Sequence, residues 1–138
     1  MSNPAKPVPR GDGLNGEFYD YCARSELRLQ KCADCGAWRH MPRYNCAECG
    51  SDQWSWEKSS GRGRLYTWTV CRRAFHPAFE KDLPYAVAIV AMEEGPRVVA
   101  EIVNRTPDQL RLEMPVEVVF EKVAENVVLP KFRAIEDG

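Results

Sequence analysis

The chain has 138 residues, a net charge of −1 and 44% hydrophobic residues, which fits one medium domain or two small modules that share a core. The near-neutral charge argues against a general polyanion-binding protein, because such proteins usually carry a basic excess. No apolar run approaches the roughly 20 residues that a membrane span needs, so we expect no association with a membrane.

The N-terminal stretch predicts a tail followed by a short helix. Residues 1–12 contain three prolines and little apolar surface, so we expect an extended, mobile tail or an arm that lies on a partner. From residue 13 onward, side chains recur at helical spacing, with Asp12 as a candidate cap. These residues are Leu14, Phe18, Tyr21, Cys22 and Ser25. We expect the aromatic stripe to pack on the module that follows or on another subunit.

Two cysteine motifs dominate the next segment, which we assign with the helix to a first module at 13–60. Leu27 and Leu29 alternate with polar residues, which predicts a strand that enters the first motif. Each motif is a Cys-x-x-Cys-Gly knuckle, whose glycine suits a left-handed turn. The four thiols belong to Cys32, Cys35, Cys46 and Cys49. Two facing knuckles supply four thiolates in a tetrahedral array, so we expect a rubredoxin-like zinc ribbon.

Other uses of these thiols stay open at this point. Disulfides would suit an oxidising compartment, but the N-terminus lacks the apolar segment of a secretory signal. A redox dithiol needs only one such motif, usually in a βαβ setting that the sequence does not show. Iron in a four-thiolate cage uses the same ligands. We favour Zn2+ over iron, and we expect a structural role because four thiolates leave no open position for a substrate. Cysteines used in a metal site also fit the reducing cytoplasm, which we expect as the location.

The residues around the second knuckle include a histidine and two tryptophans. We predict that His40 lies at the surface or supports the site from outside, because four cysteines already saturate a zinc ion. Trp54 and Trp56 are two residues apart and therefore face the same side of a strand. We expect them to cover the apolar side of the ribbon where it meets the next module.

The C-terminal part predicts a five-stranded OB-fold barrel over residues 61–133, followed by a short tail at 134–138. Gly61-Arg62-Gly63 opens this part, and five segments rich in β-branched and aromatic residues follow. They cover residues 64–72, 85–92, 97–103, 116–123 and 127–132. Closing five strands into a small barrel removes free edges and fits this length. No stretch here looks strongly helical except a turn at 107–110, so the expected fold class is mainly β.

Several motifs in this order resemble one family. Both knuckles precede Gly61-Arg62-Gly63-Arg64-Leu65-Tyr66, Asp82-Leu83-Pro84-Tyr85 opens an apolar strand, and Glu94-Gly95 closes the next turn. Met114-Pro115-Val116-Glu117-Val118 and Leu129-Pro130-Lys131-Phe132 follow. Together they resemble the acyl-CoA-associated zinc-ribbon plus OB-fold family, long catalogued as domain of unknown function thirty-five. The resemblance runs from roughly Gly16 to Arg133. Glu113 departs from it, since the family often has a glycine there.

The resemblance implies a non-catalytic accessory subunit of a CoA-thioester enzyme complex. The partner would be a thiolase-like acyltransferase or aldolase of lipid or aromatic degradation, in a hetero-oligomer such as a heterotetramer. Some relatives accompany a hotdog-fold enoyl-CoA hydratase instead, which is the alternative partner. In such complexes the ribbon and barrel help to build the groove that receives acyl-CoA.

The residues themselves agree with a role without catalysis. A thiolase-type nucleophile needs a cysteine with a base and an oxyanion hole, and the sequence offers no such set. Cys22 and Cys71 read as small buried apolar residues. CoA, in contrast, needs cations for its phosphates and a surface for adenine. Two clusters offer these groups: Arg39, His40 and Arg43, and then Arg72, Arg73, Phe75 and His76. A solvated arginine face or the rim of a protein interface is the alternative for both clusters.

Two other functions compete with this interpretation. OB-folds and zinc ribbons bind single-stranded nucleic acid through stacking aromatics in a basic groove, and Tyr66, Trp68 and Phe75 could stack in this way. Many carboxylates in the barrel segments compensate the arginines, so we expect no nucleic-acid partner. A free-standing enzyme that uses the metal is weaker still, because four thiolates saturate the site.

Overall fold

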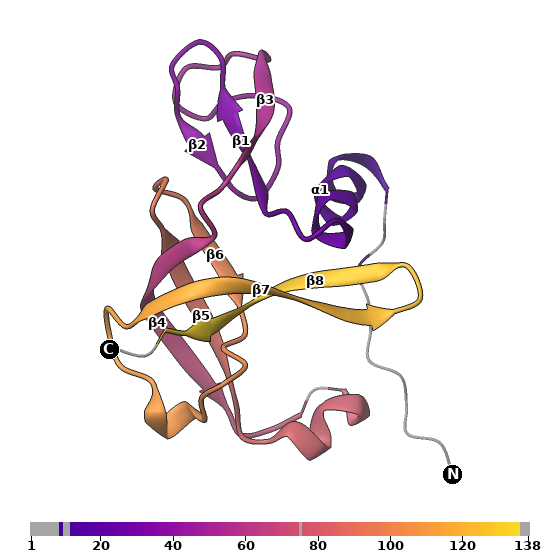
Figure 1. Ribbon diagram of the computed structural model, residues 1–138, viewed down its shortest axis with the longest axis vertical. Coiled ribbons are helices and arrows are strands. Elements are labelled where there is room, and N and C mark those ends of the chain that lie inside the picture. The colour runs from indigo at the N-terminus through magenta and orange to yellow at the C-terminus, as the bar shows by residue number, and fades with distance from the viewer. Residues whose placement is uncertain (1–8, 10–11, 75, 136–138) are drawn as a thin grey trace.

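The structure, a computed structural model, describes residue 9, residues 12–74 and residues 76–135. The tail predicted at 1–12, the tail predicted at 134–138 and the candidate residue Phe75 therefore fall largely or wholly outside the described residues. Figure 1 shows a ribbon module above a barrel, with one helix beside their junction. Within the described residues, no helix has the length and apolar character that a membrane span requires.

The elements follow the predicted order. The helix α1 spans Gly13–Ala23, and the ribbon strands are β1 (Arg28–Cys32), β2 (Trp38–Arg39) and β3 (Trp54–Lys58). The barrel strands are β4 (Arg62–Cys71), β5 (Tyr85–Met92), β6 (Arg97–Ala100), β7 (Pro115–Ala124) and β8 (Val127–Ala134). Two 3-10 helices, η1 (Pro77–Asp82) and η2 (Pro107–Gln109), lie in the barrel connections. The predicted fold class is confirmed: mainly β, with a short helix and ribbon before a five-stranded OB-fold barrel.

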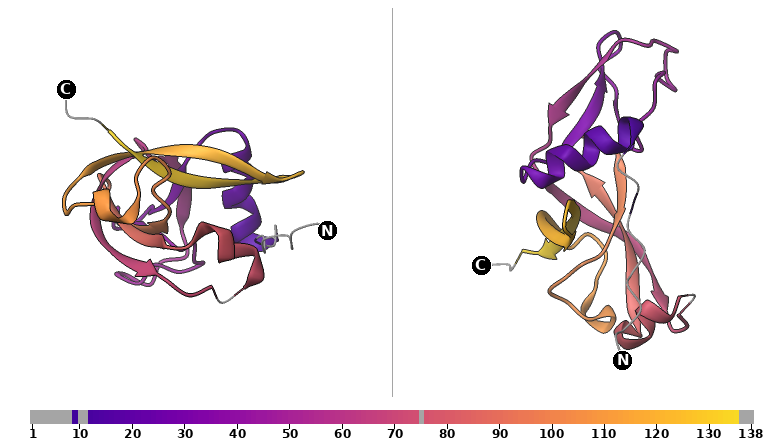
Figure 2. Two further views of the ribbon diagram at one scale, coloured as in Figure 1. Left: turned by 90° about the horizontal axis from the view of Figure 1, so that it is seen from below. Right: turned by 90° about the vertical axis from the view of Figure 1, so that its right-hand side faces the viewer.

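Helix α1 packs on both modules (Figure 2). It buries Phe18 and Cys22 and contacts β1 of the ribbon and β8 of the barrel. The Trp56 ring lies 6.5 Å from Phe18 and 5.9 Å from Tyr21. The predicted packing on the ribbon is therefore confirmed, whereas the contact with β8 was not predicted. Asp12 is the N-cap residue, but its side chain makes no capping hydrogen bond.

The ribbon is an antiparallel sheet in the order β2-β1-β3. Leu27 and Leu29 are buried as predicted, but Gln30, expected on the polar side, is fully buried too. Its Oε1 accepts hydrogen bonds from Arg39 Nε and from the backbone N–H of Arg43, both at 2.7 Å. These two bonds offset the cost of burying the amide oxygen and hold the loop between the knuckles, while the buried Nε2 of Gln30 has no hydrogen-bond partner within the described part of the chain.

The barrel is a five-stranded antiparallel sheet in the order β6-β5-β4-β7-β8. The first residues of β4 pair with β7 on one side and β5 on the other, which lets the sheet curl. The segment just after β6 is hydrogen-bonded to Phe132 of β8. The backbone N–H of Phe132 donates to the Glu101 carbonyl at 2.9 Å, and the N–H of Val103 donates to the Phe132 carbonyl at 2.8 Å. These bonds bring the two edges of the sheet together around a core that includes Leu65 and Val90.

One short helix in the barrel was not predicted. The long connection after β4 contains η1, which starts with Pro77 directly after His76. His76 Nδ1 accepts a hydrogen bond from the backbone N–H of Ala78 at 3.0 Å. A short 3-10 turn has no 3.6-residue apolar period to reveal it in a sequence. The short helix η1 is therefore an addition to the expected fold, while η2 confirms the turn expected at 107–110.

A carboxylate on the β5–β6 turn fixes the connection between ribbon and barrel. Glu94 Oε1 accepts a hydrogen bond from Ser59 Oγ at 2.8 Å, and Oε2 accepts one from the Ser60 backbone N–H at 2.8 Å. The buried Ser59 Oγ accepts a third bond from the Gly61 N–H at 3.0 Å. Glu94 therefore sets the course of the chain as it passes from one module to the other.

Removing this carboxylate is expected to weaken the fold. We expect Glu94→Ala to lower the free energy of unfolding by about 2 kcal/mol, because it leaves the Ser59 hydroxyl and the Ser60 amide without their charged acceptor. Urea unfolding followed by tryptophan fluorescence measures the change. Glu93→Ala, on the exposed neighbour in the same turn, is the control and should cost less than about 0.5 kcal/mol. Equal losses in the two variants would contradict the role given to Glu94.

The bend before β7 is built without the glycine that the family often has there. Glu113 has φ +65°, in the left-handed region that favours glycine. Its N–H donates to the Leu65 carbonyl at 2.9 Å, and its carbonyl accepts from Arg64 Nη1 at 3.2 Å. The bend is therefore kept by contacts with β4, at the cost of an unfavourable backbone conformation.

Glycine at this position should stabilise the protein. The left-handed conformation costs a non-glycine residue about 1–2 kcal/mol, and the extra freedom of glycine in the unfolded chain offsets part of the gain. We expect Glu113→Gly to raise the free energy of unfolding by about 1 kcal/mol in urea titrations. Glu125→Gly, in the β7–β8 turn, lacks a positive φ and should instead lower it by roughly 0.5 kcal/mol. A comparable loss in both variants would show that the Glu113 backbone carries no strain.

Candidate metal centre and adjoining groove

The four knuckle thiols converge on one point. The Sγ atoms of Cys32, Cys35, Cys46 and Cys49 all lie within 4.8 Å of one another. The Sγ atoms of Cys32 and Cys49 are 3.6 Å apart, as are those of Cys35 and Cys46. Zn–S bonds of about 2.3 Å in a tetrahedron place two sulfurs about 3.8 Å apart. The four sulfurs therefore fit a tetrahedral metal ion with no large movement and no further ligand.

The backbone of each knuckle supports this arrangement. Gly36 and Gly50 have φ of +77° and +78°, as predicted for the residue behind each pair. Their N–H groups donate to the carbonyls of Cys32 at 3.0 Å and Cys46 at 2.8 Å. Hydrogen bonds from the backbone of Cys35, and also of Asp34, lower the pKa of Cys32 to about 6. In each turn the backbone therefore favours the thiolate form of the first cysteine, Cys32 or Cys46, whereas the pKa values of Cys35 and Cys49 are raised.

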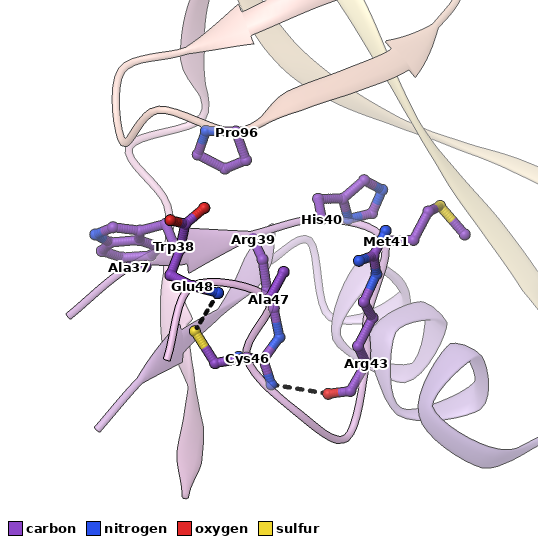
Figure 3. A pocket seen from close by; sticks show the side chains of 10 residues that line it. All are labelled: Ala37, Trp38, Arg39, His40, Met41, Arg43, Cys46, Ala47, Glu48 and Pro96. Carbon is purple, nitrogen blue, oxygen red and sulfur yellow. Dashed lines mark hydrogen bonds between the residues drawn. The ribbon is translucent and has the colours of Figure 1, made fainter. Parts of the chain in front are cut away.

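The first candidate CoA cluster lines a pocket of about 210 Å³ between the ribbon and the β5–β6 turn (Figure 3). Arg39, His40 and Arg43 all border it, opposite Pro96. Arg39 is held by Gln30 and also donates from Nη2 to the Arg43 carbonyl at 2.8 Å. The Arg43 side chain is exposed. Arg39 therefore braces the loop, and Arg43 is the cation that this cluster presents to solvent.

A larger groove of about 820 Å³ lies between α1, the loop between the knuckles and the barrel. Phe18, His40 and Met41 line its ribbon end, and strand β6 and the β7–β8 hairpin line its length. Lys131 Nζ lies on its wall, 3.1 Å from Glu101 Oε2 and 2.9 Å from Glu121 Oε2. The groove combines apolar walls with a few fixed charges, which is the usual character of a ligand site.

Sequence reasoning missed this groove. None of the candidate residues came from β6 or from the β7–β8 hairpin, which form most of its wall. The predicted OB-fold did carry a usable indication, because OB-folds bind ligands on their second and third strands between the first and last hairpin loops. In this barrel those parts are β5, β6, the connection that holds η1, and the β7–β8 turn.

His40 lies nearer the core than expected. Its ring centroid is 5.1 Å from that of Phe18, and it lines both the small pocket and the groove. Burial lowers the pKa of His40 to about 4, so the ring is neutral at pH 7. The expectation that it is no fifth ligand agrees with the converging set, which contains only the four cysteines among the described residues. His40 is half-buried, and its ring packs on Phe18 of α1.

This burial predicts a pH dependence of stability. The pKa of about 4 in the folded protein lies below the value of about 6.5 in the unfolded chain. The stability held by the neutral ring is therefore fully present above pH 6.5 and is lost as the pH falls towards 4. We expect the difference in unfolding free energy between the wild type and His40→Asn to fall by about 2 kcal/mol between pH 7.5 and pH 5. Groups common to both proteins cancel in this difference. A constant difference across that range would contradict the burial of His40.

The second candidate CoA cluster lies at the other end of the barrel. Arg72 and Arg73 are exposed and follow β4, whose ten residues span about 33 Å from the ribbon side. In Figure 1, η1 lies at the end of the barrel away from the ribbon. The Phe79 ring, which is 6.1 Å from the His76 ring, lines the groove. The structure therefore does not bring the two clusters together: His40 of the first cluster lines the groove, whereas the second cluster is linked to it only through the contact of His76 with Phe79.

The two remaining cysteines differ in their surroundings. Cys22 is fully buried, and burial raises its pKa to about 12, so it remains a neutral thiol. This confirms its interpretation as a small buried apolar residue. Cys71 is only half-buried and lies opposite Tyr85 on β5.

Comparison with known proteins decides the family. A model described as the ChsH2 rubredoxin-like zinc ribbon domain matches residues 20–55, and one described as the ChsH2 C-terminal OB-fold domain matches residues 56–121. A DUF35 domain-containing scaffold protein of Methanothermobacter thermautotrophicus is 39% identical over 104 residues, which cover 75% of this chain and 77% of that protein. The chain belongs to the ChsH2/DUF35 family.

Relatives in the ChsH2/DUF35 family differ in length and in name. The probable enoyl-CoA hydratase alpha subunit of Thermomonospora curvata is 34% identical over 128 residues, which are 93% of this chain but only 40% of that protein. A solved structure named Ltp2-ChsH2(DUF35) aldolase superposes with a TM-score of 0.81 at 33% identity and covers 94% of this chain and 98% of its own. The family therefore includes scaffold proteins and subunits of hydratase and aldolase complexes.

Proposed function

We propose that this chain is a non-catalytic scaffold subunit of a CoA-thioester enzyme complex whose partner is a thiolase-like acyltransferase or aldolase. The observation that supports this most is the similarity, over nearly the whole length of both chains, to the ChsH2(DUF35) chain of an aldolase. A hotdog-fold enoyl-CoA hydratase is the alternative partner, which the name of the Thermomonospora curvata relative favours.

In this proposal the groove forms one wall of the acyl-CoA site. Its apolar walls suit the pantetheine arm and an acyl chain, while the phosphates of CoA need cations. His40 lines the groove and shares the adjoining small pocket with Arg43, while His76 contacts Phe79 of the groove wall and follows Arg72 and Arg73 in the chain. The partner enzyme would supply the opposite wall and the groups that break and form bonds.

The four cysteines would hold Zn2+ in a structural role. Bound zinc would tie the two knuckles together, and four thiolates leave it no position for a substrate. The loop between the knuckles carries His40 and Met41 into the groove, so a rigid ribbon fixes one end of the acyl-CoA site. Metal content measured on the purified chain would distinguish zinc from iron.

Co-expression with the thiolase-like protein of the same cell tests the proposal. We expect a hetero-oligomer of fixed stoichiometry in size-exclusion chromatography with light scattering. Leu129→Asp, in the groove wall, should raise the KM of that complex for its acyl-CoA at least tenfold with little change in kcat, because it places a carboxylate in the apolar slot. A chain that remains monomeric beside thiolase-like and hydratase proteins alike would refute the proposed function.

A further inference from the structure

The outer face of strands β4, β5 and β6 carries an unusual row of side chains. Directly paired residues of antiparallel strands point to the same side of a sheet. Arg64 pairs with Ala91, and Ala91 pairs with Arg97, so these three side chains form one row across the face. Core residues such as Leu65, Val90 and Val98 occupy the opposite side. The row therefore puts one arginine on each side of a small apolar residue, Ala91, and all three side chains point away from the barrel core.

The next rows along the same face are largely apolar. Thr67, Ile89 and Val99 form one row, and Val87 follows beside Thr69. Val99 is 66% exposed and Val87 39% exposed, although β-branched aliphatic side chains are usually buried. Val99 also lines the edge of the groove. An apolar strip thus runs from the arginine row towards the proposed acyl-CoA site.

Arg97 stacks on the ring of Tyr66 at the edge of this face. The guanidinium carbon of Arg97 lies 3.9 Å from the centroid of the Tyr66 ring, which is 42% exposed. Tyrosine and arginine are enriched at the energetic centres of protein interfaces. The stacked guanidinium covers one face of the ring on which a nucleobase would stack in an OB-fold. The pair therefore suits a protein surface better than a single strand of nucleic acid.

The charge on this face selects between possible partners. The outward positions on β4–β6 carry Arg62, Arg64 and Arg97 and no carboxylate. Carboxylates adjoin the first two arginines, since Glu117 of β7 pairs with Arg62 and Glu93 and Glu113 line one pocket with Arg62 and Arg64, so Arg97 carries the main positive charge of this face. Glu101, just after β6, is paired with Lys131 at 3.1 Å. A symmetric contact between two copies would set this arginine row against itself, which like charges disfavour. An acidic rim on a different protein would complement it.

We infer that the outer face of β4–β6 is the surface on which the partner enzyme docks, and that the partner presents an apolar patch rimmed by carboxylates. The inference rests on the proposed function, because it names the surface by which the scaffold holds its enzyme. Docking here places the enzyme beside Val99 and therefore at the rim of the groove.

Two point variants of the full chain test this surface. We expect Val99→Asp and Arg97→Glu each to weaken binding to the purified thiolase-like protein at least tenfold in isothermal titration calorimetry. Both side chains point away from the core, so circular dichroism and Tm should match the wild type. The loss caused by Arg97→Glu should shrink in high salt, because screening weakens its attraction to carboxylates. The loss caused by Val99→Asp should persist.

Matched controls come from exposed residues of the ribbon. Tyr44→Asp puts the same charge on another exposed apolar residue, and Lys58→Glu reverses another exposed cation. Both should bind within threefold of the wild type. Losses as large in these controls, or wild-type binding by Val99→Asp and Arg97→Glu while the complex still forms, would overturn the docking surface and leave the proposed function standing. A wild-type chain that binds no thiolase-like or hydratase protein would overturn both.

Two further outcomes would also overturn the docking surface. One is a wild-type chain that dimerises in sedimentation experiments and becomes monomeric as Val99→Asp, since the face would then bind a second copy. The other is salt-sensitive binding of an oligothymidylate that Arg97→Glu abolishes, since the face would then bind nucleic acid.

Discussion

Cys35→Ser is expected to release the metal and unfold the ribbon while the barrel keeps its sheet. The Sγ of Cys35 lies 3.6 Å from that of Cys46 and completes the only set of four converging thiols among the described residues. Apparent binding free energies of structural zinc in small peptides reach about 10–16 kcal/mol. The ribbon has only short strands to replace such a contribution. Loss of one ligand should therefore melt this module first.

The measurement combines metal analysis with tryptophan fluorescence. Wild-type protein should contain one equivalent of zinc, and Cys35→Ser should contain less than a tenth of that. Trp38, Trp54 and Trp56 all lie in ribbon strands, so their emission should shift to the red. Cys71→Ser, which removes a thiol of the barrel, is the control and should retain metal and emission. A Cys35→Ser protein that keeps its zinc and its ribbon would contradict the structural role of the site.

Gly63→Ala is expected to destabilise the barrel by about 3 kcal/mol. A Cβ added to Gly63 would lie 2.5 Å from the Ala91 carbonyl oxygen and 2.7 Å from Val90 Cγ1. The nearer atom belongs to the backbone of the paired strand, so it cannot turn aside as a side chain could. Relief of the clash must push β4 away from β5, where Gly63 pairs with Met92.

Urea unfolding of the isolated chain measures this effect. Thr69→Ala is the matched control, because Thr69 lies on the same strand, also pairs with β5 and is exposed. It should cost less than about 0.5 kcal/mol. If Gly63→Ala were as stable as Thr69→Ala, the close approach of the two strands at Gly63 would be refuted.

The parts that the sequence predicted are those governed by local spacing. The Cys-x-x-Cys-Gly knuckles determine their own turns, and the Sγ atoms converge as expected. Enrichment in β-branched and aromatic residues located β5 at Tyr85–Met92 with the predicted bounds, and found the other four barrel strands within a few residues. In both cases the local structure is determined by residues that lie within a few positions of one another in the sequence.

The parts that were missed depend on contacts between distant residues. Gln30 reads as an exposed strand residue, and its burial depends on Arg39 and Arg43 from another part of the ribbon. Glu94 reads as an ordinary turn residue, and its bonds to Ser59 and Ser60 cross 35 and 34 positions of the chain. The groove arises only when α1, the ribbon loop and the barrel are packed together. No periodicity in one segment contains that information.

The placement of His40 shows the same limit within the candidate site. Local reasoning kept it apart from the predicted metal ligands, because four cysteines are sufficient for a zinc ion. Its position beside Phe18 depends on how α1 folds back on the ribbon, which the sequence pattern did not specify. This packing is also what carries His40 and Met41 into the groove.

In the proposed function, this chain holds and shapes a CoA-thioester enzyme without catalysing the reaction itself. The most direct test is native mass spectrometry of the chain co-expressed with the proposed thiolase-like partner, followed by thioester turnover assays on the complex and on each separated subunit. We predict a zinc-containing hetero-oligomer of fixed stoichiometry that turns over acyl-CoA, and no turnover by this chain alone. Thioester turnover by the isolated chain, or its failure to form any stable complex, would contradict the claim.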